Sequence, residues 1–105
     1  MLNFLKSLFG GAPSADFKSM VSAGAFIVDV RTVEEFRAGH VQGSVNIPLD
    51  QIASKISMLK NKKVPIIAVC RSGARSGVAT NLLKKNGLEA YNGGSWNGFE
   101  RKIAA

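Results

Sequence analysis

Cys70, the only cysteine in the chain, lies where a strand pattern runs directly into a helix pattern. Residues 64–69 have the length and β-branched content of a strand buried on both faces, with a proline tolerable only at its start. After a short turn, apolar residues recur at helical spacing over 78–83 until Gly87, which is suited to a left-handed helix cap. The thiol is therefore predicted to lie between the carboxyl end of a strand and the amino end of a helix.

This position suits a reactive sulfur anion. The first turn of a helix has unpaired backbone N–H groups and a partial positive charge, and both stabilise an anion. The segment from Arg71 to Arg75 contains small residues, so its backbone can curl around the sulfur while two guanidinium groups border it. Such surroundings lower a cysteine pKa from about 8.5 towards roughly 3.5–7.5, and we predict that Cys70 is largely thiolate at neutral pH. The alternative, a cysteine that only fills the core, does not account for the two arginines.

The composition limits the classes of function. A chain of 105 residues with 46% hydrophobic residues is large enough for one domain with one core. Lys and Arg number 14 against 7 Asp and Glu, and the net charge of +7 attracts anions or acidic protein surfaces. We expect no nucleic-acid partner, because the basic residues are scattered and lack both interleaved aromatic side chains and a recognisable nucleic-acid motif.

Metal and redox chemistry is restricted by the residue counts. One cysteine excludes a disulfide within the chain and every zinc site with several cysteines, and His40 is the only histidine. We therefore expect no metal and no cofactor. A reactive thiolate requires a reducing compartment, so the cytoplasm is the expected location.

The first 13 residues form a segment of their own. Apolar residues in 1–9 are followed by a Gly-Gly-Ala-Pro break over 10–13. The segment lacks the features of a signal peptide and the run of about 20 apolar residues that spans a membrane, so we expect no membrane span. An amphipathic turn that packs on the body is favoured over an anchor on a membrane surface. The expected domain occupies residues 14–105.

Short helices and strands alternate through the rest of the chain. Further strands are predicted over 25–30, 44–47 and 88–91, with a sharp turn over 92–94. Helices are predicted to begin at Ser14, at a capping box formed by Thr32 and Glu35, and at Asp50, and a last helix covers 95–101. Trp96 in that helix either packs on the body or walls the mouth of the site. The alternation predicts an α/β fold whose parallel sheet has helices on both faces and a ligand site beyond the strands' carboxyl ends, beside Cys70 and Asp29.

Several stretches together resemble the single-domain rhodaneses, a family of sulfurtransferases. They are Val-Asp-Val-Arg with Glu-Glu-Phe within 28–36, Gly-His-Val-Gln-Gly-Ser-Val-Asn-Ile-Pro over 39–48, Cys-Arg-Ser-Gly-Ala-Arg-Ser over 70–76, and a Gly-Gly pair followed by Trp96. The resemblance covers the chain from about Ser14 to its end. It implies a rhodanese-like parallel sheet of four to five short strands with helices on both faces, and a six-residue loop from Cys70 to Arg75.

The resemblance also implies roles for individual residues. Cys70 would carry a persulfide. The loop would bind the substrate through Arg71, Ser72, Gly73, Ala74, Arg75 and Ser76. Four further residues would hold the loops together: Asp29, Arg31, Glu35 and His40. For His40 a general base is the alternative, but a lone histidine beside glycines is more often a loop residue held by hydrogen bonds.

The implied reaction transfers a sulfane sulfur from a small anionic donor, thiosulfate or another persulfide, to cyanide, a thiol or an acceptor protein. One rival is a cysteine phosphatase or arsenate reductase of the same fold. Such phosphatases place an arginine after five intervening residues, whereas Arg75 follows Cys70 after four and Ser76 fills the phosphatase position. The shorter loop favours a single sulfur atom over a phosphate. The other rival is a non-catalytic module that binds an acidic partner, which the retention of Cys70 disfavours.

Overall fold

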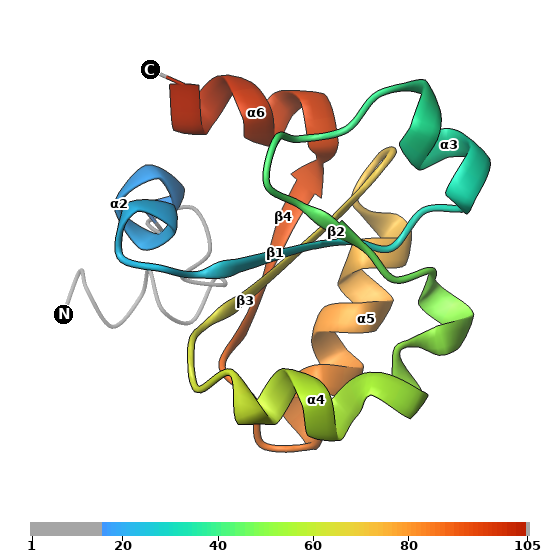
Figure 1. Ribbon diagram of the computed structural model, residues 1–105, viewed down its shortest axis with the longest axis vertical. Helices are drawn as coiled ribbons and strands as arrows, with labels where there is room; N and C mark the ends of the chain where they lie inside the picture. Colours follow the sequence, from blue (N-terminus) through green and yellow to red (C-terminus); the bar gives the residue numbers. More distant parts are fainter. Residues whose placement is uncertain (1–15, 105) are drawn as a thin grey trace, which may run out of the picture.

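A four-stranded parallel sheet forms the centre of the computed structural model, which describes residues 16–104 (Figure 1). Its strands are β1 (Phe26–Asp29), β2 (Val45–Asn46), β3 (Ile66–Cys70) and β4 (Ala90–Ser95), in the spatial order β2-β1-β3-β4. Every neighbouring pair is parallel, so all the carboxyl ends lie at one edge of the sheet. The predicted α/β fold is confirmed.

Helices cover both faces of the sheet. α2 (Phe17–Ser22) and α6 (Trp96–Ala104) pack on one face, and α4 (Ile56–Asn61) and α5 (Ala74–Lys85) pack on the other. The connections contain α3 (Val33–Ala38) and two 3₁₀ turns, η2 (Leu49–Gln51) and η3 (Ala53–Lys55). In Figure 1, α3 and the connection from β3 to α5 lie at the same end of the sheet.

Strand β3 is the centre of the core. All of its residues are buried, as expected for an inner strand that is covered on both faces. Ala68 and Cys70 belong to the apolar cluster that includes Leu83 of α5, whereas Val69 packs with Phe99 of α6 on the opposite face. Because alternate residues of a strand point to opposite faces, the Cys70 side chain points towards the α5 side.

The capping box predicted at the start of α3 is confirmed. Thr32 Oγ1 accepts a hydrogen bond from the Glu35 backbone N–H at 3.2 Å, and Glu35 Oε1 accepts one from the Thr32 N–H at 3.0 Å. The two bonds satisfy amides that the start of a helix would otherwise leave unpaired. They also fix the direction of the Glu35 carboxylate, which reaches α5 as well.

The sharp turn predicted over 92–94 is wrong, because these residues lie inside β4. The strand begins two residues later than predicted and contains a bulge, since Ala68 pairs with Asn92 but the next residue, Val69, pairs with Gly94. A Cβ atom on the intervening Gly93 would lie 2.8 Å from a methyl group of Val69 and 3.0 Å from the ring of Phe99. The glycine is therefore required by packing against the core, and the Gly-Gly pair does not mark a turn.

Asp50 does not cap a helix, contrary to the prediction. It lies within η2, whose first residue follows Pro48, and no side chain caps either 3₁₀ turn. The backbone closes the first turn instead, because the Gln51 N–H donates to the Pro48 carbonyl at 2.8 Å. The α-helix of this segment starts only at Ile56.

The helix predicted from Ser14 is present as α2, but its described cap is Asp16. The Asp16 carboxylate accepts hydrogen bonds from the Ser19 backbone N–H at 3.1 Å and from the Ser19 hydroxyl at 2.7 Å. Ser14 and the predicted amphipathic turn over 1–13 lie outside the described residues. Within residues 16–104, no helix has the length and apolar character needed to cross a membrane.

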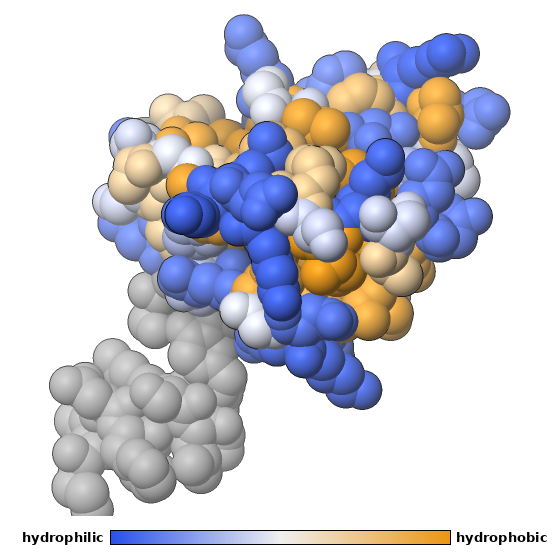
Figure 2. All heavy atoms as spheres, turned by 60° about the horizontal axis from the view of Figure 1, so that its bottom comes forward, coloured by the Kyte–Doolittle hydropathy of each residue, from blue (hydrophilic) through white to orange (hydrophobic). Residues whose placement is uncertain are grey.

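Exposed lysines gather at the end of the molecule opposite Cys70. Figure 2 shows this face, on which projecting hydrophilic side chains alternate with apolar areas. The lysines come from α4, the turn after it and the end of α5, and they are Lys60, Lys62, Lys63, Lys84 and Lys85. This end of the molecule is therefore basic and solvated.

Candidate active site

The Cys70 sulfur lies within a ring of hydrogen-bond donors formed by the loop after β3 and the first turn of α5. The Gly73 backbone N–H donates to Sγ at 3.0 Å, and the Ser76 N–H donates to it at 3.3 Å. Gly73 caps α5 with a φ of 101°, a left-handed conformation that glycine adopts without strain. The loop backbone therefore curls around the sulfur and points two amides at it.

The surroundings of Cys70 favour a sulfur anion. The cysteine is free and only 1% exposed. Burial raises the pKa of the thiol, but hydrogen bonds from the Ser76 side chain and from the backbone of Ser76, Gly73 and Ser72 outweigh it, so the pKa falls below its ordinary value. A cysteine that merely filled the core would be buried without such donors.

Asn92 of β4, which sequence reasoning did not single out, is connected to this ring. Ser76 Oγ lies 3.2 Å from the sulfur and donates to Asn92 Oδ1 at 2.6 Å. Asn92 Nδ2 donates to the Gly73 carbonyl at 3.0 Å, and the Gly94 N–H donates to Asn92 Oδ1 at 2.9 Å. Gly77 makes room for this side chain, because a Cβ there would lie 3.2 Å from Nδ2. The small residue at position 77 is the sequence signal, but nothing local identifies its partner.

Arg75 forms an ion pair with Glu35. Its Nη1 and Nη2 donate to the two Glu35 oxygens at 2.7 Å and 3.0 Å, so the pair is bidentate and joins α5 to α3. The Arg75 guanidinium holds the pKa of Glu35 at about 2, and Glu35 in turn raises the pKa of Arg75. Arg75 thus stands beside the loop with two of its five guanidinium N–H groups already bound to Glu35.

The Glu35 carboxylate is expected to make stability sensitive to acid. Its pKa in the folded protein, about 2, is below the model-compound value of 4.5, so the stabilisation is complete above about pH 4.5 and disappears as the pH falls towards 2. Glu35→Gln lacks this contribution at every pH. Its free energy of unfolding, measured by urea denaturation, should lie below that of the wild type at neutral pH and converge with it near pH 2.

Glu34→Gln is the matched control, since Glu34 is adjacent on α3 and makes no ion pair within the described residues. The difference in free energy of unfolding between Glu34→Gln and the wild type should be independent of pH. A Glu35→Gln protein that parallels the wild type through the whole acid range would show that the ion pair with Arg75 contributes nothing.

Asp29 and Arg31 form a buried ion pair at the carboxyl end of β1. Arg31 Nη2 donates to Asp29 Oδ2 at 2.7 Å and to the Gly39 carbonyl at 2.7 Å. The Arg31 side chain is 5% exposed and the Asp29 side chain is 0% exposed. The Arg31 guanidinium also lies 4.9 Å from the centroid of the Trp96 ring. These contacts tie the connections after β1 and α3 to the start of α6, and we propose that both residues support the loops in this way.

His40 is exposed, and Phe36 of α3 provides both its hydrogen-bond partner and its stacking partner. Its Nδ1 lies 2.7 Å from the Phe36 carbonyl oxygen, and its ring stacks on the Phe36 ring with centroids 3.7 Å apart. Both contacts hold the connection after α3, so the geometry favours support over a general base. In residues 16–104, no group of three or more His, Cys, Asp or Glu side chains is arranged to hold a metal ion.

Two open pockets flank the Cys70 loop. One is lined by Arg31, Glu35, Ala38, Arg71, Trp96 and Asn97, and the other by Phe17, Ser72, Gly73, Asn92, Gly93, Gly94 and Lys102. Arg71 is exposed, and Trp96 is partly buried. Trp96 therefore packs on the body through its contact with Arg31, and its ring also forms part of the wall of a pocket beside the loop.

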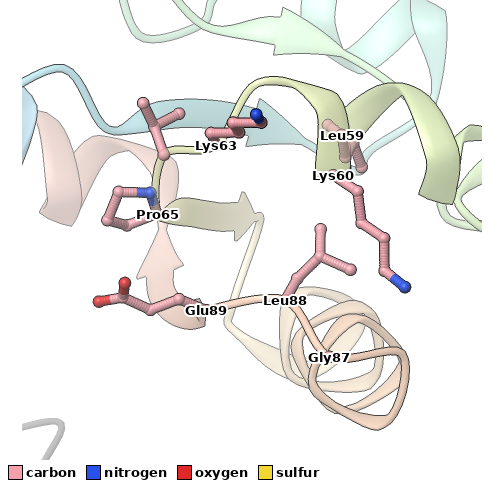
Figure 3. Close-up of a pocket in the computed structure, with 8 residues that line it drawn as sticks. Leu59, Lys60, Lys63, Pro65, Gly87, Leu88 and Glu89 are labelled. Carbon is pink, nitrogen blue, oxygen red and sulfur yellow. The ribbon is translucent and has the colours of Figure 1, made fainter.

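A further pocket lies at the opposite end of the sheet (Figure 3). Pro65 and Glu89, which line it, immediately precede β3 and β4, so they stand at the amino ends of these strands. Lys60 and Lys63 border it, and Leu88 lies between Glu89 and Lys60 in Figure 3. None of the residues predicted to bind substrate contributes to it, which leaves the two pockets beside Cys70 as the candidate approaches to the sulfur.

Comparison with protein families gives a match to the rhodanese-like domain over residues 14–102. The chain is 41% identical over 69 residues to the uncharacterized protein YqhL of Bacillus subtilis, covering 65% of this chain and 54% of YqhL. It is 38% identical over 63 residues to the putative sulfur carrier protein YrkF of the same organism, covering 60% of this chain but 34% of YrkF. The chain thus spans about half of the first relative and a third of the second.

Shorter relatives are covered more fully. The chain is 33% identical over 72 residues to the thiosulfate sulfurtransferase PspE of Escherichia coli, covering 68% of this chain and 69% of PspE. Among solved structures, a rhodanese with anions from E. coli aligns with a TM-score of 0.65 at 30% identity, over 70% of this chain and 89% of that one. The human single-domain sulfurtransferase TSTD1 aligns with a TM-score of 0.65 at 26% identity, over 81% of this chain and 89% of that one.

Proposed function

The chain belongs to the rhodanese-like family of sulfurtransferases, and from this premise we propose that it transfers a sulfane sulfur through a persulfide on Cys70. The proposed donor is thiosulfate or another persulfide, and the acceptor is cyanide, a thiol or a protein. The observation that carries the proposal is the pair of backbone N–H groups, at 3.0 Å and 3.3 Å, that point at one buried sulfur. Names among the relatives, a thiosulfate sulfurtransferase and a putative sulfur carrier, support the same chemistry.

The reaction consists of two displacements at sulfur. The Cys70 thiolate attacks the outer sulfur of thiosulfate, the Sγ–S bond forms, and the S–S bond to the sulfite group breaks with its electron pair leaving on sulfite. The acceptor then attacks the terminal sulfur, and the Sγ–S electron pair returns to Cys70 as thiolate. The first step requires no general base, because the attacking thiolate and the leaving sulfite are both anions at neutral pH. In the second step the acceptor attacks in its ionised form, as cyanide anion or thiolate.

The main obstacle is charge, because a dianion must approach an anion. The loop amides, the amino end of α5 and the two arginines would offset this repulsion, as donors do at an oxyanion site, where the loss of one costs about 3–4 kcal/mol. Arg71 is exposed in a pocket beside the loop and is available to a donor anion. Arg75 shares its charge with Glu35, so the proposal gives it a second task, which is to anchor the loop to α3.

The proposal is tested by comparing two substrates. With thiosulfate and cyanide, the protein is expected to produce thiocyanate, whereas an aryl phosphate should not be hydrolysed. The reason is the loop length, since four residues separate Cys70 from Arg75 where phosphatases have five. Phosphate release without sulfur transfer would establish the phosphatase alternative instead.

Arg75→Ala is expected to slow thiosulfate turnover by roughly ten- to a hundredfold, since it removes both a cation and the anchor to α3. Glu35→Ala removes the anchor but frees the cation, so its turnover should fall less. Steady-state rates with thiosulfate, together with the thermal midpoint of each variant, check this ranking. An unchanged rate for Arg75→Ala would mean that the cation is not used.

The proposed partners follow from the same chemistry. A small anionic donor suits the exposed Arg71 and the net charge of +7, and an acceptor protein with an acidic surface would be attracted by the same field. We propose the cytoplasm as the location, because a reactive thiolate on a lone cysteine would be oxidised where thiols do not stay reduced.

A further inference from the structure

The orientation of the Asn92 side-chain amide is fixed by its backbone partners. The Gly73 carbonyl can only accept a hydrogen bond, so the atom 3.0 Å from it must be the Asn92 NH₂ group. The Gly94 N–H can only donate, so the atom 2.9 Å from it must be Asn92 Oδ1. The Gly73 carbonyl and the Gly94 N–H thus require the same orientation of the amide, in which the oxygen of Asn92 faces Ser76.

This orientation determines what Ser76 can offer the sulfur. Asn92 Oδ1 has no proton, so in the 2.6 Å contact the Ser76 hydroxyl must be the donor. A hydroxyl has one proton, which leaves Ser76 Oγ with lone pairs for its 3.2 Å contact with Cys70 Sγ. In this arrangement the serine accepts from a thiol. The hydrogen bond from the Ser76 side chain that lowers the Cys70 pKa can form only when the hydroxyl turns away from Asn92 and donates to the sulfur anion.

We propose that Asn92 is a positioning residue that acts on Cys70 through Ser76. While the sulfur is a thiol, the S–H donates to Ser76 Oγ and the serine donates to Asn92 Oδ1. When the thiol loses its proton to solvent, the Ser76 hydroxyl turns away from Asn92 and donates to the sulfur anion. Asn92 Oδ1 then keeps the hydrogen bond from the Gly94 N–H, so no buried polar atom is left unpaired.

The same movement accompanies the proposed transfer cycle, and this consequence rests on the proposed function. The hydroxyl donates to Sγ while Sγ carries the negative charge. After the Sγ–S bond forms, the charge lies on the terminal sulfur, and the hydroxyl returns to Asn92. The proton stays on Ser76 throughout, so the change requires rotation only about the serine side-chain bonds.

This relay of hydrogen bonds from Asn92 through Ser76 to Cys70 predicts that removing Ser76 and removing Asn92 shift the thiol pKa in opposite directions. Removing the Ser76 hydroxyl removes a donor to the anion and should raise the pKa of Cys70. Removing the Asn92 acceptor frees the hydroxyl to donate to the sulfur at all times and should lower it. A purely structural asparagine would do the reverse, because loosening the loop through the Gly73 carbonyl would withdraw the amides from the anion.

Charged groups around the sulfur remain the same in every variant of this test. They are Arg71 of the loop, Arg75 of α5 with its partner Glu35 of α3, Asp29 with Arg31 beside β1, and Lys102 of α6. Their field acts on all four combinations of residues 76 and 92, so it cancels when the combinations are compared.

A double-mutant cycle isolates the relay. Because Cys70 is the only cysteine, the pH dependence of its alkylation by iodoacetamide, followed by intact mass, gives its apparent pKa directly. The cycle comprises the wild type, Ser76→Ala, Asn92→Ala and the double variant. Asn92→Ala should lower the Cys70 pKa more when residue 76 is serine than when it is alanine. The difference between the two shifts should be about half to one pH unit, which corresponds to one hydrogen bond. The same shift in both backgrounds would overturn the proposal.

Nuclear magnetic resonance on the wild type gives a second test, which needs no substitution at Asn92. The side-chain amide resonances of Asn92 should shift with the same pH midpoint as the alkylation of Cys70 and should lose most of that shift in Ser76→Ala. The relay would be refuted if the Asn92 amide shifts did not change at the pH midpoint of Cys70 alkylation, or if they changed by the same amount in Ser76→Ala. Neither measurement involves sulfur transfer, so a protein inactive towards thiosulfate can still pass or fail both.

Discussion

Replacing Cys70 with serine is expected to reduce sulfur transfer by roughly a thousandfold or more, because the bond-forming atom is lost. The variant should stay folded, since a serine oxygen can accept the same N–H groups of Gly73 and Ser76 that bind the sulfur. The measurement is thiocyanate production, combined with intact mass after incubation with thiosulfate. The wild type should gain one sulfur that a reducing thiol removes, and Cys70→Ser should gain none.

The same variant separates an enzyme from a binding module. A module that only holds an acidic partner would keep its partner and its function without the thiol. Far-ultraviolet circular dichroism and the thermal midpoint serve as controls for folding. A folded Cys70→Ser protein that still transferred sulfur would eliminate the persulfide mechanism.

Asp29→Ala is expected to destabilise the fold by about 3–5 kcal/mol, because it leaves the Arg31 guanidinium buried without its counter-ion. Such a loss is a large part of the total stability of an ordinary domain, which is about 5–15 kcal/mol. The Gly39 carbonyl and the Trp96 ring still contact Arg31, but they compensate for the charge only in part. Urea denaturation followed by the fluorescence of the single tryptophan measures the change.

Asp50→Ala is the matched control for this substitution. Asp50 is an exposed aspartate that caps neither of the neighbouring 3₁₀ turns, so its removal should change the free energy of unfolding by no more than about 0.5 kcal/mol. Equal effects of the two substitutions would contradict a stabilising role for the buried pair.

The features predicted correctly from the sequence are those set by neighbours along the chain. The capping box depends on Thr32 and Glu35 only, and both hydrogen bonds are present. The apolar run before Cys70 has the length and β-branched content of a strand covered on both faces, and β3 has that position. Alternation of strands with helices then led to the parallel sheet.

The features that were missed depend on contacts between distant residues. Glu35 and Arg75 are 40 positions apart, and Ser76 and Asn92 are 16 apart, so neither pairing can be read from spacing. The error at 92–94 has the same origin. Local preference assigns two glycines to a turn, whereas the side chains of Val69 and Phe99 take the space that a Cβ at Gly93 would need.

The burial of Cys70 at the end of an inner strand also limits which molecules can react with it. Its strand is hydrogen-bonded to neighbours on both sides, so the nucleophile cannot advance to meet a reactant. With only 1% of the residue accessible, the reactant itself must supply the reach, and a slender anion or a cysteine on an extended tail can do so. A thiol that is itself buried within another folded protein cannot reach the Cys70 sulfur. The shape of a reactant therefore determines whether it can react, whatever its affinity for the surface.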